Sequence, residues 1–278
     1  MPATPPLLRP GHGGVDVTGF SVPMVHISSA ANPLIKELRK LSSSSTAYRA
    51  LGKVWLEGDH LCRAALARGL QPELAVFSES FWPLVPVSIA QAAIKNIVIS
   101  DVLLASISTM ESPAPMGFVM ALPPKSPLAP GAASVILDRV QDAGNVGSIL
   151  RSAAAFGFTQ VLALKGCAAL WSPKVLRAGM GAHFGLQLLE GLSLEEIAAL
   201  AVPLVVTSSH QGVSLQQLVV PRPCAWVMGH EGQGVCDALL ANAAVHVRID
   251  QPGGEESLNV AAAAAICLYA SSVSLPTS

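Results

Sequence analysis

The sequence predicts an α/β protein whose C-terminal half is a parallel sheet, and three features of the chain support this prediction. Beyond residue 134, short runs of β-branched and aliphatic residues alternate with segments of helical periodicity. Parallel strands need long crossover connections, which helices supply, so this alternation indicates a sheet covered on both faces. Four prolines fall within residues 121–134 and separate this half from a smaller one. We therefore expect two domains, 24–120 and 135–278, joined by a proline-rich linker.

The composition fits a protein with a large core and no strongly charged surface. The 278 residues include 17 Lys and Arg against 18 Asp and Glu, and the sequence pI is about 6.6. This balance excludes a strongly cationic nucleic-acid coat, so any basic surface must be local. The five cysteines show no CxxC or Cys/His ligand spacing, which predicts reduced thiols and no metal site. No apolar run approaches the roughly 18 residues of a membrane span, so we expect a cytoplasmic protein without a membrane partner.

The first half of the chain is predicted to begin with a disordered leader and to continue as a small α/β domain. Residues 1–23 are rich in proline and glycine and have little apolar periodicity. The pair Asn32-Pro33 marks the start of a helix with its apolar residues on one face. Strands are expected at 54–58, 74–78 and 96–100, and helices over 59–68 and 101–108.

Basic residues cluster near the start of this half. They are Lys36, Arg39, Lys40, Arg49 and Lys53. In a domain considered by itself, such a cluster is typical of a solvated helix face. The alternative is a local surface for nucleic acid, because spaced lysines and arginines are the groups that contact phosphates.

The second half is predicted to alternate strands and helices along its whole length. The expected elements are strand 135–140, helix 145–156, strand 160–165, a helical piece near 173–180, helix 193–201, strands 203–208 and 224–229, helix 236–242, strand 245–250 and a final helix from about 257. Asn145 is predicted to be the N-cap of helix 145–156. Arg151 lies off the apolar stripe of that helix, so it is either an ordinary surface arginine or a group that meets a ligand.

Three loops in this half each follow an apolar strand and precede a helix: the turn before Asn145, residues 227–235 and residues 249–264. Open α/β sheets bind ligands at the carboxyl ends of their strands, where helix N-termini attract anions. In the second loop, glycines surround the single carboxylate of Glu231, which lies near a ligand or caps the next helix. In the third loop, Ser257 opens a long helix and is either an N-cap or a ligand contact.

Several common motifs are absent. The first strand-to-helix turn contains AGNVGS and no GxGxxG, so a nucleotide-dependent oxidoreductase lacks its glycine fingerprint. No Walker A, HExxH or GxSxG sequence occurs. His183 and His230 are lone histidines, which we predict to be structural residues.

In their order and spacing, the three loops resemble the motifs of the SpoU (TrmH-type) branch of the SPOUT RNA methyltransferases. The first motif of that family is similar to LDRVQDAGNVGSILRSAAAFG, with Asn145 and Arg151 at its Asn and Arg. The second is similar to GHEGQG, with Glu231, and the third to ESLNVAAAAAICLY, with Ser257 and Asn259.

The resemblance covers nearly all of residues 26–270. The N-terminal segments ISSAANPLIKELRKL and VWLEG resemble the small RNA-substrate domain of the same family. One departure lies in the third loop, where the family commonly has Ile-Pro-Met and this chain has Ile249-Asp250-Gln251-Pro252.

The resemblance implies a C-terminal sheet tied as a deep trefoil knot, an obligate homodimer, and S-adenosylmethionine bound in the knot. By motif position, the cofactor contacts would be Thr207, Ser208, Gly229, Ile249 and Leu258. The reaction would be methyl transfer to a ribose 2′-hydroxyl in structured RNA. Ribosomal RNA is the first expected substrate and transfer RNA the second. The small domain would then contact that RNA through its basic cluster.

The implied catalytic set is Asn145, Arg151, Glu231, Ser257 and Asn259. A guanidinium with a pKa above about 12 is a poor proton acceptor. We therefore expect Arg151 to hold the substrate phosphate and stabilise the developing alkoxide, while Glu231 or water takes the proton. The alternative is a catalytically silent RNA-binding protein that retains the SPOUT fold, and the intact set favours the enzyme.

Overall fold

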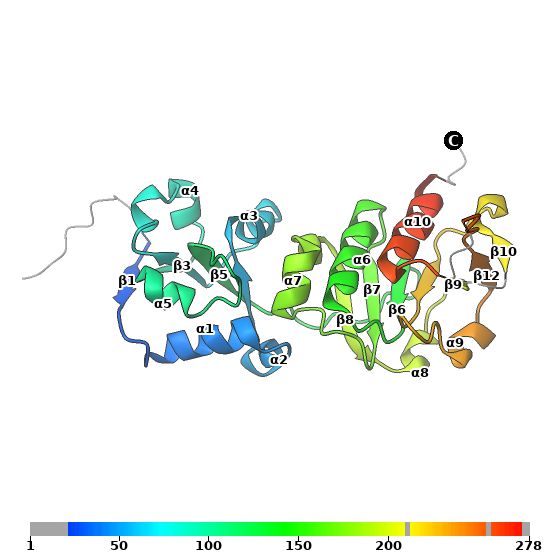
Figure 1. The fold of residues 1–278 in the computed structure, drawn as a ribbon, viewed down its shortest axis with the longest axis horizontal. Coiled ribbons are helices and arrows are strands. Elements are labelled where there is room, and N and C mark those ends of the chain that lie inside the picture. The colour runs from blue at the N-terminus through cyan, green and yellow to red at the C-terminus, as the bar shows by residue number, and fades with distance from the viewer. Residues whose placement is uncertain (1–21, 209–211, 254–256, 274–278) are drawn as a thin grey trace, which may run out of the picture.

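The computed structural model describes residues 22–208, 212–253 and 257–273, which form two sheets with helices on their faces (Figure 1). The leader predicted over residues 1–23 lies almost entirely outside the described residues. Between the last strand of the first sheet and the first strand of the second, residues 122–133 form no helix or strand. No helix in the described part of the chain is long and apolar enough to cross a membrane.

The N-terminal sheet has five strands in the order β1-β4-β3-β5-β2. They are β1 (Met24–Ile27), β2 (Lys53–Glu57), β3 (Leu74–Ser78), β4 (Lys95–Ile99) and β5 (Met116–Ala121). β5 runs antiparallel to β2 and β3, while β1, β3 and β4 are parallel. The helices around this sheet are α1 (Pro33–Ser43), α2 (Ala47–Leu51), α3 (Asp59–Ala67), α4 (Val87–Ala90) and α5 (Asp101–Ala105).

The sequence predicted most of this sheet but missed β1 and β5. α1 begins as predicted, because Oδ1 of Asn32 accepts a hydrogen bond from Leu34 N over 2.9 Å. Gly117 interrupts the apolar run of β5. A glycine is needed there because of a side chain on the neighbouring strand β2. A Cβ at Gly117 would come within 2.3 Å of the Trp55 indole on β2, so only glycine permits this packing.

The C-terminal sheet has seven parallel strands in the order β10-β12-β9-β11-β6-β7-β8. They are β6 (Ser134–Leu137), β7 (Gln160–Leu164), β8 (Gln187–Leu192), β9 (Leu204–Thr207), β10 (Val213–Ser214), β11 (Ala225–Met228) and β12 (Val245–Arg248). The helices are α6 (Ala143–Ala155), α7 (Pro173–Gly179), α8 (Leu194–Ile197), α9 (Asp237–Ala241) and α10 (Val260–Val273). The predicted parallel sheet is therefore present, although β8 and β10 were not predicted and α8 is shorter than expected.

The N-cap of α6 is a correction to the sequence prediction. Asp142, not Asn145, is the cap, because its Oδ1 accepts a hydrogen bond from Asn145 N over 2.8 Å. An aspartate caps by accepting from the backbone three residues later, which places Asn145 inside the first turn. The side chain of Asn145 is thus released for other contacts.

Both faces of the C-terminal sheet are covered. Alternate residues of β6 separate the two layers: Val135 and Leu137 belong to the core under α6 and α10, and Ile136 to the core under α8 and α9. α6 packs against both α7 and α10, and these three helices stand side by side in Figure 1. Carboxyl ends of the parallel strands therefore meet at one edge, close to the first turns of α6 and α10.

A partly buried hydrogen-bond cluster joins the two halves. The Tyr48 hydroxyl, on α2, donates to the Glu190 carboxylate on β8 over 2.7 Å. Leu170 N donates to the same carboxylate over 2.6 Å, and Arg49 pairs with it at 3.4 Å. Because Glu190 accepts from both halves at once, it fixes how the N-terminal sheet sits on the C-terminal one.

Candidate active site

The second and third predicted loops and the end of β9 line one cavity of about 550 Å³ at the carboxyl ends of the strands. Its lining includes all five predicted cofactor residues, Thr207, Ser208, Gly229, Ile249 and Leu258, and three predicted catalytic residues, Glu231, Ser257 and Asn259. These residues lie up to 52 positions apart in the chain and meet only because β9, β11 and β12 are neighbours. Eight of the ten predicted cofactor and catalytic residues therefore line the same cavity, and their roles stay predictions.

A line of three polar side chains closes one side of this cavity. Nδ2 of Asn259 donates to Oδ1 of Asn145 over 2.9 Å, and Nδ2 of Asn145 donates to Oε1 of Glu231 over 3.2 Å. Oδ1 of Asn259 accepts from Ala261 N and Ala262 N, so this residue also caps α10. Each amide therefore has a fixed orientation, and one residue from each motif takes part.

Glu231 is held as a carboxylate against the start of α6. It accepts hydrogen bonds from Gln141 N at 3.3 Å and Asp142 N at 3.1 Å, in addition to the amide of Asn145. Partial burial alone would raise its pKa, but the backbone N–H groups and that amide together bring the pKa below its ordinary value. A carboxylate stabilised in this way is a weaker base, so the geometry favours a holding role over proton removal.

The glycine loop after β11 has an internal fold of its own. His230 and Gly234 exchange backbone hydrogen bonds of 3.0 and 2.8 Å. Nδ1 of His230 accepts from Gly232 N at 3.0 Å and Gln233 N at 3.2 Å, so the ring holds the loop together. A Cβ at Gly229 would lie 2.4 Å from the backbone of Gly234, which explains why glycine is needed there. The predicted structural role of His230 is confirmed.

The second lone histidine also has a structural role. His183 is buried, and its Nε2 lies 2.9 Å from Leu170 O. Burial lowers its pKa to about 4, so the ring is neutral at physiological pH. It packs against Trp171, away from the residues that line the cavity.

Sequence reasoning missed a pair of residues that support the glycine loop. Nε of Arg139 donates to Oδ1 of the buried Asp138 over 2.9 Å, and one Nη donates to Oε1 of Gln233 over 2.9 Å. The other carboxylate oxygen of Asp138 accepts from Cys236 N at 2.7 Å. Arg139 has a φ of +58°, which is uncommon for a residue with a side chain. The available signal in the sequence was the charged pair Asp138-Arg139 directly after the buried strand β6.

Arg151 does not line the cavity. It is exposed on α6, and no ion pair or hydrogen bond of its side chain occurs within the described residues. It lies six positions after Asn145, which is one full turn plus about two-thirds of another, so the two side chains leave the helix on different sides. Within one chain, Asn145 joins the polar line and Arg151 does not.

The predicted basic cluster of the N-terminal half is divided by ion pairs. Lys53 pairs with Glu37 at 3.4 Å and with Glu73 at 3.5 Å, and Arg49 pairs with Glu190. Nη2 of Arg39 donates to Ser106 Oγ over 2.7 Å. Lys36 and Lys40 are exposed, and neither has an ion pair among the described residues. The free positive charge of this cluster is thus on α1.

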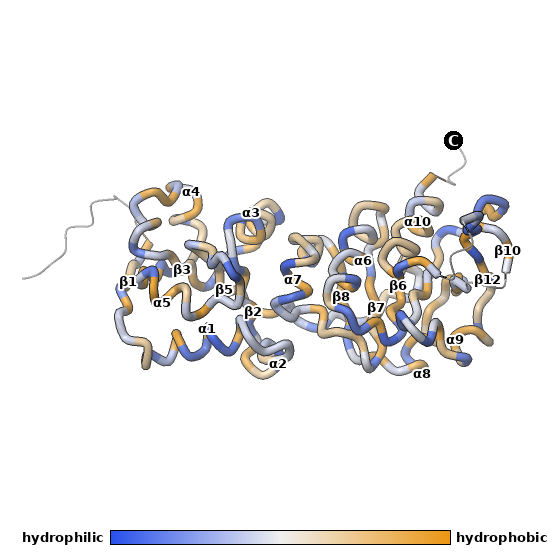
Figure 2. Tube along the Cα trace, viewed as in Figure 1, coloured by the Kyte–Doolittle hydropathy of each residue, from blue (hydrophilic) through white to orange (hydrophobic). Residues whose placement is uncertain are grey.

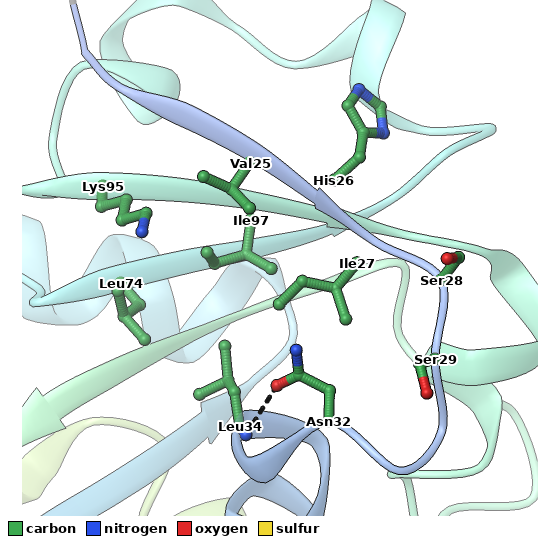
Figure 3. Close-up of a pocket in the computed structure, with 10 residues that line it drawn as sticks. All are labelled: Val25, His26, Ile27, Ser28, Ser29, Asn32, Leu34, Leu74, Lys95 and Ile97. Carbon is green, nitrogen blue, oxygen red and sulfur yellow. Dashed lines mark hydrogen bonds between the residues drawn. The ribbon is translucent and has the colours of Figure 1, made fainter.

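A second cavity, of about 510 Å³, lies beside β1 in the N-terminal sheet. Figure 3 shows an apolar wall of Ile27, Leu34 and Ile97, with Asn32 turned toward the α1 backbone that it caps. No carboxylate or thiol lines this cavity. His26 and Lys95 line it, so it offers basic side chains but no acidic one comparable to Glu231 in the other cavity.

Comparison with known proteins agrees with the site. Residues 132–269 match the family model of the SpoU rRNA Methylase family. A Synechocystis protein described as an uncharacterized tRNA/rRNA methyltransferase is 34% identical over 255 residues, covering 87% of this chain and 92% of the relative. The Bacillus subtilis 23S rRNA (guanosine(2553)-2′-O)-methyltransferase RlmP is 30% identical, covering 88% and 98%.

Solved structures share the fold over both halves. The crystal structure of an RNA 2′-O ribose methyltransferase has a TM-score of 0.74 and 30% identity, covering 89% of this chain and 98% of that one. An AdoMet-bound rRNA methyltransferase from Sinorhizobium meliloti has a TM-score of 0.76 at 24% identity, which shows a common fold over 89% of this chain and 97% of that one.

Proposed function

The chain belongs to the SpoU rRNA methylase family, and from that membership we propose that it transfers the methyl group of S-adenosylmethionine to a ribose 2′-hydroxyl of ribosomal RNA. One observation carries this proposal: the hydrogen-bonded line from Asn259 through Asn145 to Glu231, which joins all three family motifs beside one cavity. The relatives described as rRNA methyltransferases support ribosomal RNA as the substrate class, and transfer RNA comes second.

The cavity suits S-adenosylmethionine in size and chemistry. Its volume of about 550 Å³ lies in the range of roughly 300–1,000 Å³ that is usual for small-molecule sites. Ile249 and Leu258 offer apolar contacts for a nucleobase, and Thr207 and Ser208 offer hydroxyl groups at the end of β9. Gly229 lets the backbone of Gly234 pack directly against it, which gives the loop the shape that lines the cavity.

Proposed roles of the residues follow from their contacts. The cofactor, when bound, supplies an electrophilic methyl group. Asn145, Glu231 and Asn259 hold the cavity wall rigid, and such orientation is worth up to roughly 7–11 kcal/mol in a displacement reaction. Ser257 lines the cavity, and its hydroxyl would meet the substrate there. Arg151 would hold the substrate phosphate and stabilise the alkoxide, with water as the proton acceptor in preference to Glu231.

A homodimer would complete this site. Ile266, Tyr269 and Val273 are exposed along α10, and Phe156 at the end of α6 meets Tyr269 edge-on at 5.7 Å. An apolar strip of this kind is typical of a subunit interface. Since Arg151 leaves α6 on a different side from Asn145, we propose that each subunit presents its Arg151 to the cavity of the partner.

Mixed dimers test this arrangement. One subunit would carry Arg151→Ala, and the other Gly229→Val, whose side chain would clash with the backbone of Gly234 and disrupt the glycine loop that lines the cavity. If Arg151 acts across the interface, the mixed dimer keeps one working site and about half of the wild-type activity per dimer. If Arg151 acts within its own chain, both sites are inactive and the mixed dimer shows no activity.

The central experiment compares methylation with RNA binding. Tritiated S-adenosylmethionine and an unmodified in vitro transcript of bacterial 23S rRNA should give labelled RNA whose methyl group maps to a ribose. Arg151→Ala should leave cofactor affinity intact and lower the single-turnover rate by about two to three orders of magnitude, as for loss of an oxyanion donor. A wild-type chain that binds cofactor and RNA but transfers no methyl group would instead be the catalytically silent RNA-binding protein.

Three further properties belong to the same proposal. The division into domains 24–120 and 135–278 is supported by the two sheets and by the absence of regular structure over 122–133. The deep trefoil knot is supported by membership of the family, and a cytoplasmic location by five cysteines that are all free thiols.

A further inference from the structure

Positive charge is concentrated on three helices, α1, α6 and α7, each of which has hydrophilic segments, drawn in blue in Figure 2. Together they carry six of the 17 lysines and arginines and one of the 18 acidic residues, although the whole chain has a net charge of −1. The basic residues are Lys36, Arg39, Lys40, Arg151, Lys174 and Arg177. Their one acidic residue, Glu37, is already paired with Lys53. A uniform distribution of charge would not leave three adjacent helices so strongly basic.

These helices form a continuous series across both halves of the molecule. α7 packs against α1 and β2 of the N-terminal half and against α6 of the C-terminal half, and it lies between them in Figure 1. Its contact with α6 is very close: a Cβ at Gly147 would lie 2.3 Å from Cβ of Ala178. Arg151 lies one turn beyond Gly147, Lys174 one turn before Ala178, and Arg177 immediately before it.

The cations of this series have no acidic partner within the described residues, whereas five basic residues elsewhere are neutralised by carboxylates. Arg49, Lys53, Arg63, Arg139 and Arg248 are each paired with a carboxylate. Lys36, Lys40, Arg151, Lys174 and Arg177 have no such pair within residues 22–208, 212–253 and 257–273. A cation that is not neutralised by its own chain retains its full attraction for a phosphate.

We propose that Lys174 and Arg177 of α7 bind phosphates of the substrate RNA, so that the RNA-binding surface extends from α1 across α7 to Arg151 on α6. This inference rests on the proposed function and adds residues that the sequence motifs do not contain. α7 is the one helix of this series that touches both halves, so RNA that contacts Lys36 and Lys40 must cross it to reach α6. The contact is to phosphates, which are evenly spaced and independent of sequence.

The test measures RNA affinity as a function of salt for the double variant Lys174→Gln, Arg177→Gln. The probe is the same unmodified 23S rRNA transcript. Each lost phosphate contact should reduce the slope of log affinity against log salt by about 0.7–0.9 units. Affinity for S-adenosylmethionine, by calorimetry, and the midpoint of thermal unfolding should stay at wild-type values, because neither side chain lines the cavity or is bonded within the described fold.

A matched control loses the same charge elsewhere. Lys125→Gln, Lys165→Gln removes two exposed lysines outside the three helices and should leave the salt slope unchanged. Lys174→Arg, Arg177→Lys keeps the charge and should also keep the slope. A folded Gln double variant with the wild-type slope, or a control that flattens the slope equally, would overturn the inference. If the wild-type chain still methylates RNA in these experiments, only the inference about α7 fails and the proposed function stands. If the wild-type chain does not bind RNA at all, the proposed function itself is refuted.

Discussion

The side-chain amide of Asn259 donates to Oδ1 of Asn145 over 2.9 Å, although the two residues are 114 positions apart. This bond joins the start of α10 to the first turn of α6. Because Asn259 also caps α10 with its oxygen, docking of that helix and closure of the cavity wall depend on the same side chain. The predictions below follow this line of contacts outward.

Asn145→Asp should weaken the cavity wall without removing its link to α10. The new carboxylate still accepts from Asn259, but it no longer donates to Glu231 and places a second negative charge beside it. We expect S-adenosylmethionine affinity to fall about tenfold, which corresponds to about 1.4 kcal/mol. Calorimetry measures this, with Asn242→Asp at the exposed end of α9 as control. Wild-type affinity in the Asn145 variant would show that the polar line does not shape the site.

Glu231 should make stability depend on pH in the acid range. Its pKa in the folded protein lies below its ordinary value, so its stabilising contribution is present above the unfolded-state pKa and is lost as pH falls through the folded-state pKa. The difference in unfolding free energy between wild type and Glu231→Gln should thus be constant from about pH 6 to 8 and shrink below about pH 4.5. Urea melts at several pH values measure it. A difference that grows toward acid pH would mean that the fold favours the protonated form.

Gly147→Ala should separate α6 from α7. The added methyl would come within 2.3 Å of Ala178 Cβ and 2.7 Å of the backbone of Gly179, and backbone cannot turn aside as a flexible side chain can. We expect a loss of about 1–3 kcal/mol in unfolding free energy, as for other overpacked sites. Gly131→Ala is the control, because nothing lies within 4 Å of a Cβ there. Equal stability of the two variants would mean that the helices can move apart freely.

The sequence predicted those parts of the fold and site that depend on local pattern. Apolar runs identified β6, β7, β9, β11 and β12, and motif positions identified the lining of the cavity. The N-cap of α6 was wrong because Asp142 and Asn145 are both good capping residues, and the hydrogen bond that decides between them is a matter of geometry. Membership of the family predicted from the three motifs is confirmed.

Contacts between residues that are distant in the chain could not be predicted from the sequence. Five basic residues looked equivalent in sequence, yet Arg49 and Lys53 are neutralised by Glu190 and Glu73, which other strands and loops bring near. The availability of Lys174 and Arg177 is equally invisible in sequence, since it depends on which carboxylates are absent from their surroundings. Charge counts along a chain therefore do not locate a charged surface until the fold is known.

Tyr48→Phe should loosen the junction between the two halves. Burial and the Glu190 carboxylate raise the pKa of Tyr48, so the hydroxyl remains a proton donor at every physiological pH. Its loss leaves a carboxylate with fewer partners, and we expect about 1–3 kcal/mol lower unfolding free energy. RNA methylation should fall while cofactor affinity stays unchanged, because the cavity lies elsewhere. A Tyr48 variant with wild-type stability would argue that Arg49 and Leu170 suffice as partners of Glu190.

Arg139 supports the glycine loop through two side-chain contacts. Its guanidinium reaches both Asp138 and Gln233, and a lysine ammonium, as a single point charge, cannot replace both contacts. Arg139→Lys should therefore raise the KM for S-adenosylmethionine with little change in kcat, since the loop carries Gly229 and Glu231 but the reacting groups are untouched. Gln233→Ala should do the same.

A double-mutant cycle separates this role from simple stabilisation. If Arg139 acts through Gln233, the double variant Arg139→Lys, Gln233→Ala should raise KM no more than the larger single change, because both remove one contact. Arg139→Gly gives an independent check. Glycine relieves the positive φ of +58°, so a variant that lost only backbone strain would gain stability and keep its KM. We expect instead a raised KM, because the guanidinium that holds the loop is gone, and additive effects in the cycle would refute the proposed path through Gln233.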